Sequence, residues 1–333
     1  MPEHPLPHMT GSPTASILPS AASVREAAAR IAPHVVRTPL ARSEGLSAFL
    51  GGDVWLKHEC GQHTGSFKLR GASNVVALLD APARVKGVVA SSAGNHGAGI
   101  AAAAASAGVP CMVFIPRTAP AAKRGWITAA GAAVDASAPH YDDAEALARA
   151  FAAETGAMFV SPCTGLDLMA GQGTVALEIV EDLPSVRTIV TSVGGGGLSG
   201  GMGGFLNDAA PHVTLIGAQS ANTDAMARAL SANAPADDPH LPTVCDGLSG
   251  LVDAEMLAQG RESLDRIAIA SEDAVRDAIA YLWIEEGLRV EGAGAAGVAA
   301  LLAGTAGDVP FPCAVVLSGG NIDDALHREI CGL

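Results

Sequence analysis

The chain has 333 residues, of which 49% are apolar and only 4% aromatic, and its 39 glycines and 20 prolines follow no fixed period. This composition excludes collagen, a coiled coil and general disorder, and leaves one large domain or two closely packed lobes. The 34 acidic residues outnumber the 20 lysines and arginines, giving a formal charge of -14. A field of that sign repels phosphate backbones and anionic lipid heads, which argues against nucleic acid and membranes as partners.

The N-terminal segment and the cysteines are typical of a cytoplasmic protein. Residues 1–22 are rich in Pro, Ser and His and lack a basic start leading into an apolar core, so we expect a disordered or loosely docked tail rather than a signal peptide. The six cysteines form no C-x-x-C pair, which indicates reduced thiols. Cys163 and Cys313 have no basic neighbour in sequence, and we expect both to be inert.

From residue 24 onward, short β-branched runs alternate with alanine-rich segments long enough for helices. The expected strands are 88–90, 112–115, 188–191, 213–216 and 314–317. The expected helices are 95–107, 141–154, 173–182, 272–286 and 294–302. Runs that are apolar at successive positions are typical of strands covered on both faces. The pattern therefore predicts an α/β protein with two-lobed open parallel sheets wrapped by helices.

Glycine-rich turns follow three of these strands, where an α/β sheet binds its ligands. The turn with four consecutive glycines, Gly194, Gly195, Gly196 and Gly197 before Leu198, can hold a phosphate on bare main-chain N–H groups, although a merely tight turn is the alternative. It also matches the dinucleotide pattern G-x-G-x-x-G. That pattern is weak by itself, and the next strand leads to Gln219 rather than to an acidic residue that would bind a ribose. No G-K-[ST] follows, which excludes a nucleotide P-loop.

Lys68 stands among small and apolar neighbours in the segment 62–71. A desolvated lysine can attack a carbonyl as the free amine, whereas the alternative is a lysine that extends from a helix start to solvent. A nucleophilic amine, a phosphate cradle that is not a P-loop and polar turns that can contact a ring together indicate pyridoxal phosphate as the cofactor.

On these motifs the sequence resembles the fold type II (tryptophan synthase β-like) pyridoxal phosphate enzymes, in the branch of serine/threonine dehydratase and serine racemase. The matching motifs occur in family order: T-G-S-F-K-x-R-G-A at 64–72, S-A-G-N-H-G at 92–97, A-G-Q-G-T at 170–174, G-G-G-G-L at 194–198, D-G-L at 246–248 and S-G-G-N at 318–321. The resemblance implies a large cofactor-binding domain of residues 23–85 and 164–333. It also implies a small domain, 86–163, that closes over the substrate, and a homodimer.

The resemblance also implies roles for individual residues. Lys68 is expected to be the Schiff-base lysine and the base that removes the α-proton, and Asn95 to bind the 3′-hydroxyl of the cofactor. Gly194 to Leu198 would bind its phosphate, and Ser318 would face its pyridine nitrogen. The turn of Ser92, Ala93, Gly94, Asn95 and His96 would bind the substrate carboxylate. Ser66 and the cofactor phosphate are both candidates for the acid that protonates the leaving hydroxyl.

Two departures from the family pattern are informative. Serine racemase has a second serine on the opposite face of the cofactor where this chain has Ala93, so elimination is expected to dominate racemisation. The family's divalent-cation site has a glutamate and an aspartate where this chain has Gln219 and Ala225. Losing two anionic ligands should abolish that site, so no metal is expected, and a shifted site at Asp224 is the alternative.

The implied activity is that of a lyase that eliminates water from a β-hydroxy-α-amino acid such as L-threonine or L-serine, giving a 2-oxo acid and ammonia. Alternative substrates are 3-hydroxyaspartate, a phenylserine-like amino acid or an intermediate of compatible-solute breakdown, and serine racemase activity ranks below these. A non-catalytic pyridoxal-phosphate-binding protein is the alternative from another class, against which the intact Lys68 argues.

Several further residues have open interpretations. His140 and Tyr141 are candidates for the substrate entrance, and nearby Glu145 is expected on a solvated helix face. Glu291 lies near the cofactor in the resemblance, but a paired structural carboxylate explains it equally well. Substrate choice is expected to depend on loops around 140, 163–167 and 246–249.

Overall fold

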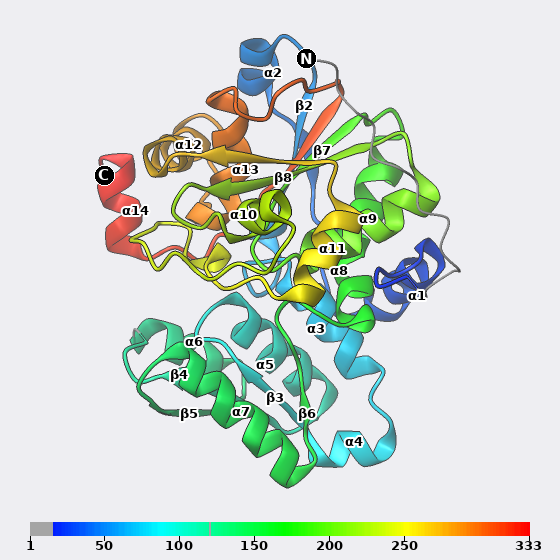
Figure 1. Ribbon diagram of the computed structural model, residues 1–333, viewed down its shortest axis with the longest axis vertical. Helices are drawn as coiled ribbons and strands as arrows, with labels where there is room; N and C mark the ends of the chain where they lie inside the picture. Colours follow the sequence, from blue (N-terminus) through cyan, green and yellow to red (C-terminus); the bar gives the residue numbers. More distant parts are fainter. Residues whose placement is uncertain (1–15, 120) are drawn as a thin grey trace.

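The computed structural model describes residues 16–119 and 121–333, which form two lobes, each built around its own sheet (Figure 1). The strand order in the six-stranded sheet is β1-β2-β10-β7-β8-β9, and in the four-stranded sheet β5-β4-β3-β6. All neighbouring strands are parallel except β1 and β2. The α/β expectation with parallel sheets is confirmed.

The strands of the large sheet are β1 (Leu40–Arg42), β2 (Val54–Lys57), β7 (Thr188–Ser192), β8 (Thr214–Ser220), β9 (Arg266–Ala270) and β10 (Cys313–Val316). Those of the small sheet are β3 (Val88–Ser91), β4 (Cys111–Pro116), β5 (Ala133–Ala138) and β6 (Met158–Phe159). The central strands β7 and β10 are buried at every residue. This full burial explains why β10 is apolar at successive positions, whereas β7 keeps Thr188, Thr191 and Ser192 as buried polar residues.

Helices cover both faces of each sheet. In the large lobe they are α1 (Ala21–Ile31), α2 (Glu44–Leu50), α3 (Lys68–Ala77), α8 (Leu166–Asp182), α9 (Gly197–Ala209), α10 (Ala225–Ala232), α11 (Ala254–Ser263), α12 (Glu272–Ile284), α13 (Gly292–Leu302) and α14 (Asp324–Cys331), with the 3-10 turns η1 (Glu59–Gly61) and η2 (Asp246–Leu248). The small lobe has α4 (Ala81–Lys86), α5 (Asn95–Ala107), α6 (Ala121–Ala129) and α7 (Tyr141–Thr155).

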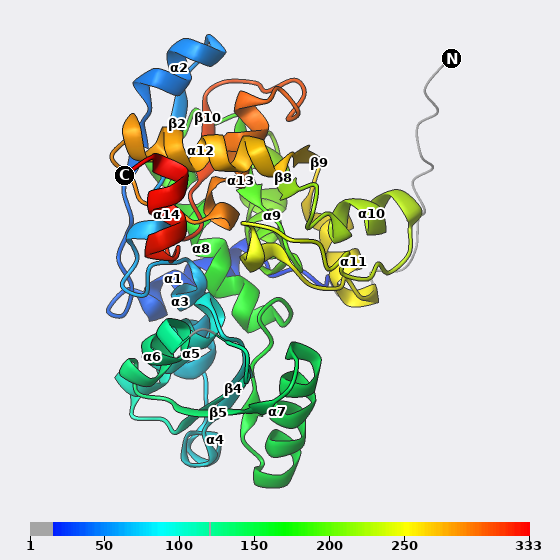
Figure 2. The same ribbon diagram turned by 90° about the vertical axis from the view of Figure 1, so that its left-hand side faces the viewer.

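Successive residues of β7 point to different cores of the large lobe. Ile189 packs with α1, α8 and α9, and Val190 packs with α12 and α13 on the other face. Figure 1 shows α12 and α13 on one side of the sheet and α8 and α9 on the other, and Figure 2 views the molecule from the side of α12, α13 and α14. In the small lobe α5 and α6 cover one face, and α7 covers the other. No helix among the described residues is long and apolar enough to cross a bilayer.

Helix α8 begins at Leu166, earlier than the start expected at Gly173, because its glycines serve close packing rather than a turn. A Cβ on Gly171 would lie 2.6 Å from the main-chain oxygen of Arg70, and one on Gly173 would lie 2.5 Å from that of Gly201. The glycines therefore let α8 approach α3 and α9 closely. Strand β8 is also longer than expected, since it continues to Ser220.

Part of the expected N-terminal tail lies outside the described residues, namely 1–15. Residues 16–22 are packed against the large lobe. The Leu18 side chain is buried beside α9, and the Ala21 amide donates to Asp208 at 2.9 Å. Ser20 caps α1 through a hydrogen bond from the amide of Ser23.

A buried cluster of four charges anchors the start of α3. Arg70 donates through Nε and Nη2 to Glu59, both at 2.8 Å, and through Nη1 and Nη2 to Glu178 at 2.7 and 2.9 Å. Lys57 completes the cluster with a 2.6 Å contact to Glu178. Burial alone would lower the pKa of Arg70, but the two carboxylates outweigh it and raise that pKa. The cluster is neutral in sum and ties α3 to β2, η1 and α8.

Replacing Arg70 should destabilise the protein strongly. In Arg70→Met two carboxylates lose their main partner inside the core, so we expect the free energy of unfolding to fall by about 3–5 kcal/mol. Urea denaturation measures this change. The exposed pair of Arg276 and Glu329 is the control, since Arg276→Met should cost less than about 1 kcal/mol. Equal effects of the two substitutions would contradict the anchoring role.

Candidate active site

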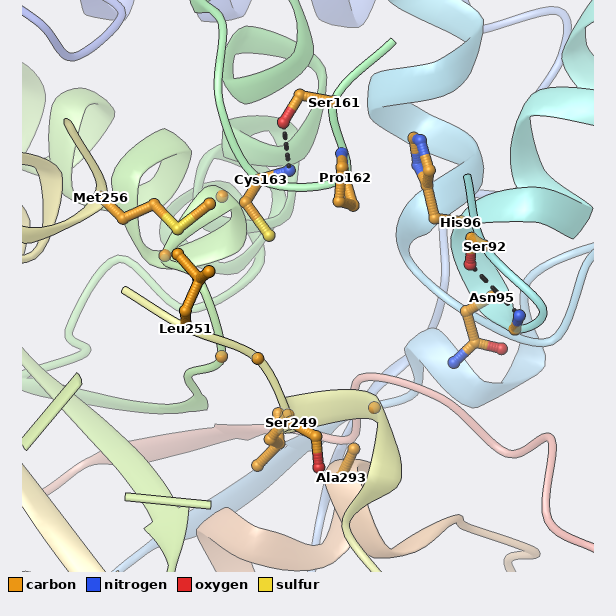
Figure 3. Close-up of a pocket in the computed structure, with 18 of the residues that line it drawn as sticks. Ser92, Asn95, His96, Ser161, Pro162, Cys163, Ser249, Leu251, Met256 and Ala293 are labelled. Atoms are coloured by element: carbon orange, nitrogen blue, oxygen red, sulfur yellow. Dashed lines mark hydrogen bonds between the residues drawn. The ribbon is translucent and has the colours of Figure 1, made fainter. Parts of the chain in front are cut away.

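A cavity of about 1220 Å³ is lined by residues of both lobes, where strands of the two sheets end. The three glycine-rich turns expected from the sequence meet there: Ser92 follows β3, Gly194 follows β7 and Ser318 follows β10. In Figure 3, Ser92, Asn95 and His96 lie on one side of the cavity and Cys163, Leu251 and Met256 on the other. The fold therefore brings the separate motifs into one site.

Lys68 is the first residue of α3 and lines this cavity half-buried. Its Nζ donates to the main-chain oxygen of Pro162 at 2.8 Å and lies 5.1 Å from the centre of the Phe67 ring. Pro162 belongs to the segment that crosses from β6 in the small lobe to α8 in the large lobe. The amine is thus held at the junction of the lobes rather than extended into solvent.

The tetraglycine turn connects β7 to α9 and lines the cavity with main chain. Within the described chain, the N–H groups of Gly194, Gly195 and Gly196 have no hydrogen-bond acceptor. Cys163 packs directly against this turn: a Cβ on Gly195 would lie 2.6 Å from its Sγ, and one on Gly197 would lie 2.9 Å from its Cα. Gly196 has φ of +91°. The approach of Cys163 requires glycine at 195 and 197, and the positive φ favours glycine at 196. The turn forms a cradle of free amides at a helix N-terminus, suited to an anion.

Ser318 lies in the cavity wall and is paired with a residue that sequence reasoning missed. Ser192, the last residue of β7, donates to the Ser318 hydroxyl at 3.0 Å, and both side chains are buried. Because Ser318 accepts the proton of Ser192, its own proton remains available to a ring nitrogen. A polar residue at the carboxyl end of a central strand, two residues before the first glycine of the turn, was the signal that could have identified Ser192.

The turn from Ser92 to His96 opens helix α5 toward the cavity. The amide of Gly94 donates to Ser92 Oγ at 3.2 Å, which shapes the turn. His96 is buried and its Nε2 lies 2.9 Å from the main-chain oxygen of Val160. Burial, followed by the charge of Lys68, lowers the pKa of His96 to about 3. The imidazole is therefore neutral at physiological pH, and this turn presents amides rather than a cation.

The structure does not bring Ser66 into the cavity lining. Ser66 is fully buried, its main chain bridges to Gly319, and its Oγ has no partner among the described residues. Its proposed acid role stays a prediction. Tyr141 and Glu145 do line the cavity, although Glu145 was expected on a solvated face. Cys163, expected to be inert, forms part of the wall against the glycine turn.

The residues at the family's cation position do not fit a divalent metal. Gln219 Nε2 donates to the main-chain oxygens of Val193 and Thr223 at 2.9 and 2.8 Å, and its Oε1 accepts from the amide of Ala227 at 2.9 Å. Asp224, the alternative ligand, is paired with Arg228 at 2.7 Å. No group of three or more His, Cys, Asp or Glu within 16–119 and 121–333 is placed to hold a metal ion.

The lining fits pyridoxal phosphate. A primary amine at Lys68 suits its aldehyde, and the cradle of unpartnered amides suits its phosphate. The paired hydroxyl of Ser318 suits its ring nitrogen, and the Asn95 amide suits its ring hydroxyl.

Comparison with known proteins leads to the same group. The family model described as pyridoxal-phosphate dependent enzyme matches residues 31–319. The chain is 39% identical over 302 residues to an L-threonine ammonia-lyase of Thermotoga maritima, covering 90% of this chain and 75% of that protein. It is 35% identical over 306 residues to a serine racemase of Oryza sativa, covering 90% of each.

Solved structures of this group superpose over nearly the whole chain. Maize serine racemase matches with a TM-score of 0.89 at 32% identity, covering 94% of this chain and 96% of that one. The T.th. threonine deaminase matches with a TM-score of 0.84 at 34% identity, covering 92% of this chain and 99% of that one.

The glycine cradle can be tested by filling it. In Gly197→Ala the new methyl group meets the main chain of Cys163, which has no flexible end to move, and overpacking of this kind costs about 1–3 kcal/mol. We expect the dissociation constant of pyridoxal phosphate to rise by about tenfold or more in a spectroscopic titration. Gly125→Ala in α6, where a Cβ meets nothing within 4 Å, should bind as the wild type does. Unchanged binding by Gly197→Ala would refute the cradle.

The hydrogen bonds of Gln219 predict independence from divalent cations. Treatment with a chelator should leave the melting temperature and the cofactor occupancy unchanged, because a bound ion would otherwise stabilise the folded state by mass action. Added Mg²⁺ or Ca²⁺ should not raise the melting temperature beyond the effect of equal ionic strength from NaCl. A specific rise with either ion would contradict the interpretation.

Proposed function

Because the chain belongs to the fold type II pyridoxal-phosphate-dependent enzymes, in the group of serine/threonine dehydratases and serine racemases, we propose that it eliminates water from a β-hydroxy-α-amino acid. The proposed substrates are L-threonine and L-serine, and the products are a 2-oxo acid and ammonia. Similar proteins include both threonine ammonia-lyases and serine racemases, so the choice of elimination over racemisation depends on the residues of the site.

The observation that carries the proposal is the methyl group of Ala93 in the cavity wall. Elimination needs one base at the α-carbon, whereas racemisation needs a second proton-exchanging group on the opposite face. Of the neighbouring hydroxyls, Tyr141 donates its proton to the main-chain oxygen of Ser91 at 3.2 Å, whereas Ser92 accepts from the amide of Gly94. Burial raises the pKa of the Tyr141 phenol, which disfavours its anion as a base.

The proposed reaction uses a small number of groups of this chain. When bound, pyridoxal phosphate supplies an electron sink for the bond that breaks at the α-carbon. Lys68 Nζ accepts the α-proton, and the β-hydroxyl leaves with a proton as water. The unsaturated amine that is released tautomerises to an imine, and water then hydrolyses it to the 2-oxo acid and ammonia. Ser66 remains the sequence-based candidate for the acid at the leaving oxygen.

Ser318 influences which outcome the cofactor favours. A hydroxyl that donates to the ring nitrogen leaves that nitrogen without a full positive charge, unlike a carboxylate partner. Negative charge at the α-carbon is then less fully delocalised into the ring. This favours prompt loss of a β-substituent over slower chemistry such as transamination.

The charges around the cavity favour a neutral substrate side chain. Arg149 is the one arginine among the described lining residues, and Glu145 engages it at 2.7 and 2.9 Å while the guanidinium stacks on Phe159. Asp246 and Asp253 add negative charge to the lining. The side-chain carboxylate of 3-hydroxyaspartate would find Arg149 already paired with Glu145. We therefore rank 3-hydroxyaspartate below L-threonine and L-serine as a substrate.

We further propose, from the family resemblance, that residues 86–163 close over the substrate and that the protein forms a homodimer. Closure would exclude water from the site during the reaction. The lining contributed by both lobes supports this proposal, because movement of one lobe changes the access to Lys68.

The decisive assay offers the purified holoenzyme L-threonine, L-serine and 3-hydroxyaspartate and measures both 2-oxo acid and D-amino acid. We expect 2-oxo acid from the first two and little D-amino acid. Lys68→Ala should abolish turnover, and near-normal rates in that variant would reject the role of Lys68. A cofactor-loaded protein that releases no 2-oxo acid from any hydroxyamino acid would instead favour the non-catalytic alternative, and predominant D-serine would favour the racemase.

A matched pair of variants isolates the contribution of Ala93. Ala93→Ser adds a hydroxyl to the cavity wall and should increase D-serine formation relative to elimination. Ala102→Ser, which adds the same group to helix α5 outside the cavity lining, should leave the ratio unchanged. An unchanged ratio in both variants would remove the argument from Ala93.

A further inference from the structure

The side-chain amide of Asn95 is held at both ends. Its Nδ2 donates to Glu291 Oε1 at 2.6 Å, and its Oδ1 accepts from Asn321 Nδ2 at 2.7 Å. Asn321 Nδ2 also donates to the main-chain oxygen of Thr64 at 2.8 Å. The Glu291 carboxylate and the main-chain oxygen of Thr64 can only accept hydrogen bonds, so the atoms that contact them must be the NH2 groups of Asn95 and Asn321. These contacts therefore fix the orientation of both side-chain amides. One N–H of Asn95 Nδ2 remains after the bond to Glu291.

Glu291 reaches this position because of the turn that follows β10. It precedes α13, lines the cavity and is only 7% exposed. Its amide donates to the main-chain oxygen of Gly319 at 3.1 Å, and a Cβ on Gly319 would lie 2.1 Å from Glu291 Oε1. The S-G-G-N motif therefore supplies both the space for Glu291, at Gly319, and the second partner of Asn95, at Asn321.

We propose that Glu291 is a positioning residue that holds the Asn95 amide with its remaining N–H directed at the ring hydroxyl of the cofactor, and that it places a buried negative charge beside that hydroxyl. The inference rests on the proposed contact between Asn95 and the hydroxyl. Of the two interpretations of Glu291, it favours a role at the cofactor over a paired structural carboxylate, because Glu291 both lines the cavity and contacts Asn95.

The ionisable groups around this pair come from several elements. Lys68 on α3, His96 on α5 and Asp246 on η2 line the same cavity, and His96 is neutral. Behind Glu291, burial and then nearby carboxylates, Glu291 among them, raise the pKa of Cys60 to about 11. A side cavity of about 30 Å³, bordered by Asn95, Asp246, Glu291 and Asn321, has room for about one water. The charge of Glu291 therefore acts on Asn95 at hydrogen-bonding distance, with little solvent between them.

The test follows the visible absorption of bound pyridoxal phosphate as the pH is changed. A buried carboxylate disfavours ionisation of a neighbouring hydroxyl, so removing its charge should lower the titration midpoint. We expect Glu291→Gln to shift the midpoint down by about one pH unit. Asn321→Ala leaves the charge in place but frees the Asn95 amide, so it should weaken cofactor binding by about tenfold with a midpoint near that of the wild type.

The control is Glu285→Gln, an exposed residue outside the cavity, which should change neither quantity. A wild-type midpoint together with wild-type affinity in Glu291→Gln would overturn the proposal. If Glu291→Gln does not fold, as judged by circular dichroism, cofactor affinity is measured instead in Glu291→Asp and in Asn321→Ala. Unchanged affinity in both variants would reject the positioning role.

Failure of the premise is distinguishable from failure of the inference. Asn95→Ala should weaken cofactor binding and shift the titration if Asn95 contacts the hydroxyl. An Asn95→Ala protein that binds and titrates as the wild type does removes the premise. The readout needs no turnover, so a protein that proves to be a racemase or inactive toward hydroxyamino acids leaves this test intact.

Discussion

The start of helix α3 determines where the amine of Lys68 can lie, and the rest of the site is arranged around it. Helix α3 is packed between α5 of the small lobe and α8 of the large lobe, and the contact with α8 is close because Gly71 and Gly171 carry no side chains. Arg70 anchors the same turn of α3 through hydrogen bonds to the buried carboxylates of Glu59 and Glu178. Because these contacts restrict the main chain of Lys68, they also restrict the positions that its amine can reach. An amine held in a narrow range of positions reacts more readily with a bound partner.

The cofactor of the family is an anion, although this chain has a formal charge of -14 and the described residues that line the cavity contain no cluster of cations. The cradle that we propose for the phosphate consists of main-chain N–H groups at the start of α9, and the turn proposed to bind the substrate consists of amides at the start of α5. Such dipoles are fixed by the fold and act over short distances, so they remain effective within an acidic surface. Lys68 is then free to act as an amine rather than as a counter-ion for phosphate.

Much of this arrangement could be predicted from the sequence, because strand ends of a parallel sheet carry ligand turns and three such turns contained unusual residues. The family and its cofactor followed from T-G-S-F-K and the tetraglycine run, and the comparisons confirm both. Packing distances were not readable in the same way. The early start of α8, the contact of Cys163 with the glycine turn and the pairing of Ser192 with Ser318 join segments far apart in the chain, and the seclusion of Ser66 depends on the complete fold. The domain boundaries and the residue roles stay predictions.

The segment 160–163 links the chemistry of the site to the geometry of the whole molecule. Its carbonyl oxygens at Val160 and Pro162 engage His96 and Lys68, while the segment leads from β6 of the small lobe to α8 of the large lobe. The contact of Val160 with His96 lies within the small lobe, whereas the contact of Pro162 with Lys68 reaches α3, so a rotation of one lobe relative to the other would lengthen or shorten the contact that restrains the ε-nitrogen. The reactivity of the Lys68 amine would therefore depend on the angle between the two lobes.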